Sequence, residues 1–198
     1  MSYHPGRFLA VGVLSLLAVA PSWAAETMVS NPFYKFWAAF KPGARVVRLE
    51  RTKLSGPEGK LVPGGVDEKR IVYKLIRVDK NRAVVEMVVT EQDFLGSIQA
   101  APTRHTYPAK LEKSRLERIY LEDGGKTGED TVEVKGKKIK TKTVSGTIKG
   151  QDGEQIQFKL WLSDKVPGMI VKEVRTARKK SDVLAETTTT TQSYKKGE

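Results

Sequence analysis

Two periodicities of hydrophobic positions divide the chain. Four aromatic residues near the N-terminus fall at positions i, i+3, i+4 and i+7, which places them on one face of an α-helix. Asn31 is a good N-cap for this helix, and Pro32 suits its first position, because the missing N–H of proline would have no partner there. The pattern predicts a short helix that starts after Asn31 and ends before Pro42. Its aromatic residues are Phe33, Phe36, Trp37 and Phe40.

This aromatic stripe leaves two alternatives open. Large rings on so short a helix bury more apolar area than the helix needs to form, so the helix must pack against another element. In the first alternative it is a core helix that closes one end of a sheet. In the second it is a lid over an apolar cavity. The four aromatic residues, together with Trp161 from a later strand, are therefore the candidate ligand-binding residues.

From Ala44 onward the hydrophobic period changes to two, which is the alternation of β-strands. The alternation is clearest where every second residue from Ile156 to Leu162 is hydrophobic. The predicted strands are Arg45–Lys53, Arg70–Val78, Arg82–Thr90, Arg115–Leu121, Asp130–Lys135, Lys138–Lys149, Gln155–Leu162, Met169–Ala177 and Val183–Tyr194.

Short reversals join several of these strands. Asp79–Asn81 suits a hairpin, Gly136-Lys137 suits a two-residue turn, and Val166–Met169 has proline and glycine where a type II turn requires them. Such reversals connect antiparallel neighbours, whereas parallel strands need long crossovers. We therefore expect a mainly β protein. It consists of a single antiparallel, strongly curved sheet, a half-barrel or partly closed barrel, with the short aromatic helix packed on it.

Three segments depart from simple alternation. Leu54–Val66 is rich in glycine and proline and is predicted to be a flexible loop. Glu91–Tyr107 is less regular, and its hydrophobic residues near Ile98 are spaced for a helical turn. Thr187–Thr191 puts hydroxyl groups on both faces of the last strand. This tract is predicted to be a solvated or edge strand, with the polar lining of a cavity as the alternative.

Residues 1–24 have the pattern of an export signal. One positive charge precedes the apolar run Phe8–Ala20, and small residues follow at the positions that a signal peptidase reads. The run is shorter than the ~20 residues of a permanent membrane anchor. We expect cleavage between Ala24 and Ala25, no transmembrane anchor after cleavage, and a single domain over 25–198. The localisation predicted is the periplasm or the secreted fraction of a bacterium.

The composition argues against several kinds of site. The chain has no cysteine, which removes disulfides, a thiol nucleophile and a lipid-accepting cysteine. Without the leader, His105 is the last remaining imidazole, and one histidine cannot form the usual zinc site. No glycine pattern for phosphate binding and no nucleophile elbow is present. We therefore expect no catalytic residues, no metal and no cofactor, and we expect that the protein is not an enzyme.

The charge is strongly positive. It is +12 for the whole chain, and +11 once Arg7 leaves with the leader. A basic surface favours acidic partners such as anionic lipid or polysaccharide, although a solvated face is the preferred explanation of this charge. Nucleic acid is not expected, because the compartment is wrong. The candidate anion-binding residues are Lys138, Lys140, Lys142, Lys172 and Arg175.

Several segments resemble an uncharacterised family of secreted bacterial β-domains. They are the lysine-rich hairpin Lys126–Val144, the W-x-S-D-x-V-P-G pattern within Lys159–Lys172, the threonine-rich Glu186–Gln192 and the N-terminal Trp37–Gly43. This family is similar to the half-barrels of lipoprotein-localisation factors, the LolA/LolB-like group. The resemblance implies a concave sheet and a helical lid that hold acyl chains. It implies no catalytic residues, and a thiol role is absent because Thr141 stands where some members carry cysteine.

Two functional hypotheses follow. In the first, the protein is an exported, soluble binding protein that holds an apolar or lipid ligand in the curved sheet under the aromatic helix. In the alternative, it is a basic envelope protein that binds anionic lipid or polysaccharide surfaces without an internal ligand. The first rests largely on the likeness of fold.

Overall fold

The computed structural model describes residues 27–55, 61–93, 96–113, 126–149, 153–180 and 182–198. The predicted leader over 1–24 and the predicted strand Arg115–Leu121 lie outside these residues. Within them, the chain is almost entirely β-structure with one short helix, α1 (Pro32–Ala38). Two small strands, β1 (Met28–Ser30) and β7 (Lys110–Glu112), pair with each other beside the helix.

The main sheet is antiparallel and has the strand order β5-β4-β3-β2-β12-β11-β10-β9-β8, with β6 also paired to β4. Its strands are β2 (Arg45–Ser55), β3 (Leu61–Val78), β4 (Arg82–Asp93), β5 (Gly96–Gln99), β6 (Thr103–Pro108), β8 (Lys126–Val134), β9 (Lys137–Lys149), β10 (Gln155–Leu162), β11 (Ile170–Lys179) and β12 (Asp182–Lys195).

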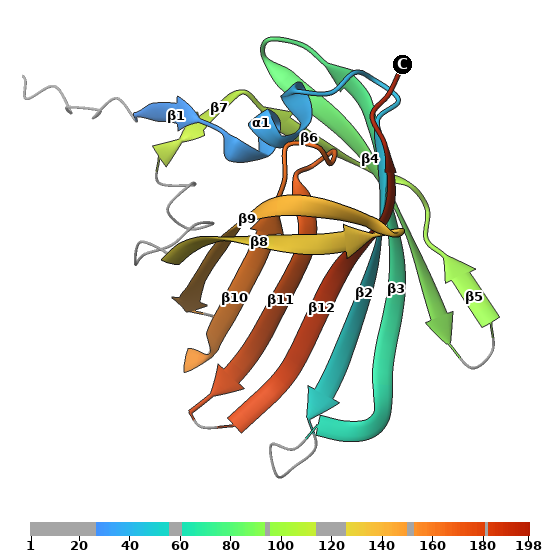
Figure 1. Cartoon of the computed structure of the whole chain (residues 1–198), viewed down its shortest axis with the longest axis vertical. Helices are drawn as coiled ribbons and strands as arrows, with labels where there is room; N and C mark the ends of the chain where they lie inside the picture. Colours follow the sequence, from blue (N-terminus) through green and yellow to red (C-terminus); the bar gives the residue numbers. More distant parts are fainter. Residues whose placement is uncertain (1–26, 56–60, 94–95, 114–125, 150–152, 181) are drawn as a thin grey trace, which may run out of the picture.

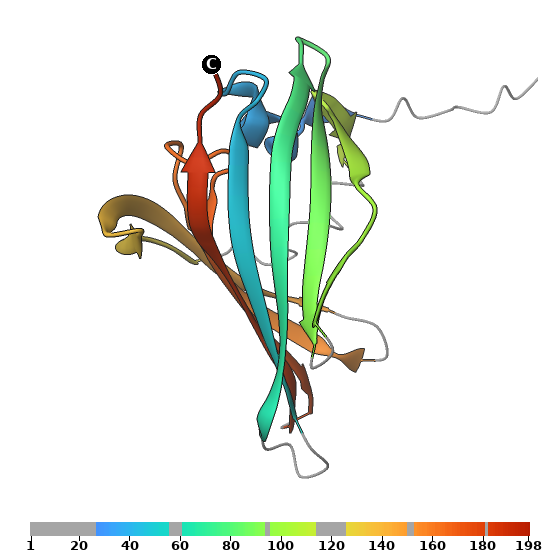
Figure 2. The ribbon, with the colours of Figure 1, turned by 90° about the vertical axis from the view of Figure 1, so that its right-hand side faces the viewer.

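The sheet consists of two meanders joined by the pairing of β2 with β12. Figures 1 and 2 show that it curves strongly and does not close into a barrel. The expected fold class, a curved antiparallel half-barrel with a short aromatic helix, is therefore confirmed. The long pairing between β2 and β12 joins the first long strand of the described chain to the last one at the centre of the sheet.

Helix α1 lies on the concave face, across one end of the sheet (Figures 1 and 2). Asn31 caps it as predicted, because its side chain accepts a hydrogen bond from the N–H of Phe33. The same side chain donates to the carbonyl of Pro108, and the Tyr34 hydroxyl donates to the carbonyl of Asp79 at 2.8 Å. The helix is thus fixed to β6 and to the turn between β3 and β4.

The β8–β9 hairpin crosses the opposite, convex face of β10, β11 and β12 (Figure 1). It can do so because β9 is long and serves two partners. Lys137–Ser145 pairs with β8, and Lys142–Lys149 pairs with β10. Val134 and Ile139, near the tip of the hairpin, are 4% and 3% exposed. The sheet is therefore covered on both faces at the end where α1 lies.

Most predicted strands are observed within a few residues, and Gln155–Leu162 matches β10 at both ends. The turn Val166–Met169 is also confirmed, since the N–H of Met169 donates to the carbonyl of Val166 and Gly168 has φ +70°. The two-residue hairpin turn lies one position earlier than predicted. It is Lys135-Gly136, both with positive φ, which is the conformation of a type I′ turn.

Three predictions about irregular segments were wrong. The predicted loop Leu54–Val66 contributes its last residues to β3, which begins at Leu61 and pairs with β2. The stretch Glu91–Tyr107 contains strands β5 and β6 and no described helical turn, because both strands pair with the long edge of β4. The threonine tract is not at an edge, because β12 lies between β2 and β11.

Candidate functional site

The structure brings together the four aromatic residues of the N-terminal stripe. Trp37 and Phe40 are buried, at 5% and 7% exposed, and Phe33 and Phe36 are half-buried. Phe33 stacks on Tyr107 of β6 with 5.8 Å between the ring centroids. Phe40 lies just beyond the last helical residue, Ala38, so the helix is shorter than the stripe.

Trp37 packs against a glycine in the turn between β10 and β11. A Cβ atom on Gly168 would lie 2.9 Å from Cζ2 of Trp37, so only glycine fits this contact. The N–H of Gly168 also donates to the carbonyl of Phe36 at 3.1 Å. These contacts, with the bonds of Asn31 and Tyr34, fit the alternative in which the helix closes one end of the sheet.

Trp161 belongs to the same core of buried residues as Trp37 and Phe40, but it is not on the helix side of the sheet. It lies on the convex face, where its indole N–H donates to the Asp130 carboxylate of β8 at 2.8 Å. The ammonium groups of Lys159 and Lys172 lie 4.7 and 4.9 Å from its ring centroid, within the range of cation–π contacts. The hydrogen bond from Trp161 lowers the pKa of Asp130, and the two lysines lower it further. The cluster attaches the β8–β9 hairpin to β10.

The candidate anion-binding residues do not form one patch. Lys138, Lys140 and Lys142 are exposed on one face of β9. Glu133 lies directly opposite Lys138, and Glu129 lies directly opposite Lys142, so carboxylates offset part of the positive charge. The other two candidates, Lys172 and Arg175, are three residues apart on β11 and therefore point to opposite faces of the sheet.

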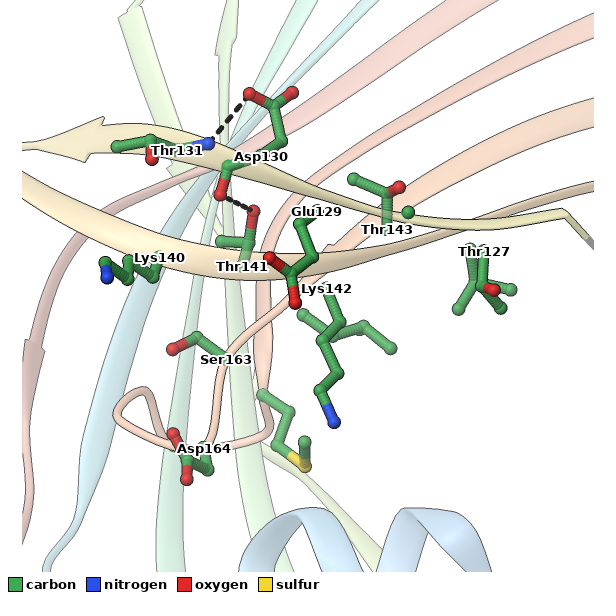
Figure 3. A pocket seen from close by; sticks show the side chains of 14 residues that line it. Thr127, Glu129, Asp130, Thr131, Lys140, Thr141, Lys142, Thr143, Ser163 and Asp164 are labelled. Atoms are coloured by element: carbon green, nitrogen blue, oxygen red, sulfur yellow. Dashed lines mark hydrogen bonds between the residues drawn. The ribbon is translucent and has the colours of Figure 1, made fainter.

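A polar pocket of about 990 Å³ opens where the hairpin leaves the sheet (Figure 3). Residues of β8 and β9 form one wall, and the turn after β10 forms the other. Two lysines, Lys140 and Lys142, and three carboxylates, Glu129, Asp130 and Asp164, line the pocket. Five charged side chains are not the lining expected for the chain of a lipid. The remaining lining residues are four threonines, Gly128, Val144, Leu162, Ser163 and Met169.

The concave face of the sheet carries hydrophobic residues on both flanks, and polar and charged residues run across its centre. The pairing registers align Arg48 of β2 with Ile71 of β3 and with Thr191 of β12. In the next row, Glu50 aligns with Thr189, and Thr189 with Glu173 of β11. The Arg48 row continues through Ile71 to Val89 of β4. The Glu50 row continues to Lys69 of β3 and Glu91 of β4 on one side, and to Leu160 of β10 on the other. Further hydrophobic residues of this face are Met87 of β4 and, on β10, Ile156 and Phe158, the last of which lies beside Arg175 of β11.

The threonine tract supplies part of this polar centre. Thr189 and Thr191 are 7% and 2% exposed. The Thr191 hydroxyl donates to the carbonyl of Ile170 at 2.9 Å, and Thr52 and Thr187 share a hydrogen bond across β2 and β12. The alternative prediction of a polar inner lining therefore describes the tract better than a solvated edge strand does.

Arg48 is the residue that the sequence analysis missed. Its side chain is buried on the concave face, 8% exposed, and its guanidinium lies 4.9 Å from the ring centroid of Tyr73. Nη2 donates to the carbonyl of Gly168 at 3.3 Å, and Nε has no hydrogen-bond partner. Burial lowers the pKa of Arg48, while Tyr73 and Glu173 oppose this effect.

A weak signal for Arg48 exists in the sequence. It shares a strand face with Val46, which is completely buried. However, Val47 and Leu49 make the other face equally hydrophobic, so the alternation of β2 does not reveal which face is covered. Two phenols lie near Arg48, those of Tyr73 and Tyr107. Burial raises the pKa of both.

No protein-family model matches this sequence, and no curated protein matches it. The chain is similar to a solved structure of the MucA/MucB complex from Pseudomonas aeruginosa, with 12% identity, a TM-score of 0.36, and coverage of 82% of this chain and 55% of that one. It thus spans about half of that chain. It is also similar to a DUF1329 family protein from Desulfovibrio piger, with 8% identity, a TM-score of 0.23, and coverage of 78% and 85%. Both likenesses are too distant to support an argument about function.

No helix in the described part of the chain is long and apolar enough to cross a membrane. No group of three or more histidine, cysteine or carboxylate residues within the described ranges is placed to hold a metal ion.

Proposed function

We propose that this is an exported binding protein that holds an apolar or lipid ligand against the concave face of the sheet, next to the end closed by α1. The supporting observation is that hydrophobic residues on the concave face are only partly buried. Met87, Val89 and Phe158 are half-buried on a face that the described helix covers only at one end. Apolar side chains left half-covered on a concave surface are typical of a ligand site.

The proposal is for binding without catalysis in the periplasm or outside the cell. The basic alternative, binding of anionic envelope surfaces by the β9 lysines, receives less support. Glu129 and Glu133 stand opposite two of those three lysines and reduce the local charge. The polar pocket beside the hairpin has mixed charge as well.

The direct test is to purify the mature protein from a bacterium and to look for bound lipid by native mass spectrometry. Titration with the neutral apolar probe N-phenylnaphthylamine then measures the site without any contribution from charge. We expect saturable binding that Phe158→Asn weakens about tenfold. Gln157→Asn is the matched control, because the neighbouring residue points to the other face of β10.

Failure of both measurements, with no copurified lipid and no saturable binding of the probe, would refute the proposal. The export part has its own test. N-terminal sequencing of the protein made from the full gene is expected to find Ala25 first, and a cytoplasmic form that retains Met1 would contradict it.

A further inference from the structure

The strongest unexplained feature of the described chain is the charge of Arg48. A guanidinium group has five N–H donors and stays protonated in proteins. Here it has one long bond to a neutral carbonyl, at 3.3 Å, and a face-on contact with Tyr73. Among the described residues, no carboxylate forms an ion pair with it. A buried charge without a partner is destabilising, and a hydrophobic residue of similar size would often serve the fold better.

The nearby carboxylates are already engaged. Glu173 has its side chain 12% exposed and forms an ion pair with Arg175. Glu50 accepts a hydrogen bond from Thr189 at 3.5 Å. Among the described residues, the positive charge of Arg48 is therefore left without a direct counter-ion, whereas other buried polar side chains, such as Thr191 and Asn31, have hydrogen-bond partners.

The surroundings of Arg48 suit an anion that carries an apolar tail. Tyr73 and Tyr107 both interact electrostatically with the guanidinium, and burial keeps their phenols in the neutral form, which can donate a hydrogen bond. Ile71 lies directly beside Arg48 in the sheet, and Val89 lies beside Ile71. A cationic fork thus borders the apolar flank of the concave face.

We propose that Arg48 is the anchor for an anionic headgroup, a carboxylate or a phosphate, of an amphiphile whose chain lies along the concave hydrophobic residues. This proposal rests on the proposed function, because it names the class of ligand for the same face. Arginine is suited to the task, because its planar fork donates two parallel hydrogen bonds to either group. The ligand supplies the direct ion-pair partner that Arg48 does not have among the described residues.

The test compares three ligands with the same chain and different headgroups. They are lauric acid, dodecyl phosphate and the neutral methyl laurate, each measured by displacement of N-phenylnaphthylamine. We expect at least one of the two anions to bind about tenfold or more tightly than the ester. Which anion binds better distinguishes a fatty acid from a phosphate-bearing lipid as the source of the headgroup.

Two variants locate the effect. Arg48→Gln is expected to abolish the preference, so that the two anions and methyl laurate bind with similar affinity. Arg51→Gln is the matched control, because Arg51 lies on the other face of β2, exposed and paired with Glu68. Arg48→Lys keeps the charge without the fork and is expected to keep part of the preference.

The outcomes separate this proposal from the proposed function. If wild-type protein binds methyl laurate as tightly as both anions, the anionic subsite is refuted and the apolar site stands. If Arg48→Gln keeps the full preference, Arg48 is not the anchor. If no ligand displaces the probe and the probe itself does not bind, the proposed function fails first. If Arg48→Gln does not fold, the proposal is tested by two other measurements. These are the preference of the wild-type protein for an anion over methyl laurate, and the part of that preference that Arg48→Lys retains.

Discussion

Helix α1 and the β8–β9 hairpin cover opposite faces of the same end of the sheet, and they are attached in different ways. The helix places aromatic rings in the core and is held by hydrogen bonds to the 108–109 backbone, to Asp79 and from Gly168. Where it crosses the convex face, beyond the pairing of β9 with β10, the hairpin is held by a few buried aliphatic residues and by the Trp161–Asp130 bond. We infer that the helix is part of the cooperative core, whereas the hairpin is the cover that opens at lower cost.

The largest effect is expected for Trp37→Ala, which removes the central ring of the helix. Because Trp37 is only 5% exposed, its loss should reduce the free energy of unfolding by ~3–5 kcal/mol. Chemical denaturation measures this loss. A cost below about 1 kcal/mol would mean that the ring faces a cavity and that α1 is a lid after all.

Gly168→Ala tests the contact that seats the helix on the turn after β10. The new methyl group would meet Trp37 in a backbone conformation, φ +70°, that disfavours side chains, so we expect a loss of about 2–3 kcal/mol. Gly153→Ala is the control, because Gly153 has φ +76° and open space where a Cβ would be. Equal losses in the two variants would show that the Trp37 contact contributes nothing.

Tyr34→Phe removes the hydroxyl that links the helix to the carbonyl of Asp79. Loss of one such hydrogen bond should cost about 0.5–1.5 kcal/mol, measured by thermal denaturation. In Tyr194→Phe, the hydroxyl removed has no hydrogen-bond partner among the described residues, so the change should be smaller. If Tyr34→Phe is as stable as the wild type, the hydrogen bond from Tyr34 to Asp79 does not help to hold the helix.

The smallest global effect is expected for Asp130→Asn, which acts on the hairpin. Fluorescence of Trp161 in a Trp37→Phe background should shift to the red as the hairpin loosens, with little change in overall stability. Asp164→Asn serves as the control, because Asp164 is exposed in the polar pocket. A red shift as large in the control as in Asp130→Asn would contradict the assignment.

The same bond predicts a pH dependence. The pKa of Asp130 is held below its ordinary value of 3.8, mainly by the hydrogen bond from Trp161. The carboxylate therefore favours the closed hairpin above that pH, and this contribution is lost as the pH falls through the lowered pKa. Wild-type protein should show the red shift of Trp161 only in acid, and Asp130→Asn should show it at every pH.

Local sequence patterns were sufficient to predict the elements that depend on residues close together in the chain. Asn31, Pro32 and the aromatic stripe predicted α1, because a helix places residues three and four apart on one face. Gln155–Leu162 was recognised as a strand because its alternation is uninterrupted. The turn at Gly168 was recognised from its proline and glycine, but its role as the seat of Trp37 was not, because that contact joins residues 131 positions apart.

The candidate site was predictable only in part for the same reason. The aromatic residues of α1 were identified, but Trp161 was assigned to the same cluster and lies on the other face of the sheet. The five threonines looked like an edge strand, and they pair with β2 and β11 at the centre, where hydroxyl groups bond to neighbouring strands. Burial of these residues depends on strand order, which a pattern along one strand does not contain.

The amino-acid sequence by itself determined that the chain forms a curved antiparallel sheet with one aromatic helix, because periodicity and turn chemistry act over a few residues. Only the tertiary structure decided which face of each strand is covered. Arg48 is buried because α1 and the turn at Gly168 close over that face of β2, and Trp161 is covered because β9 bends across the convex face. Pairing between distant strands sets these positions, and side chains that look alike in sequence therefore have different surroundings.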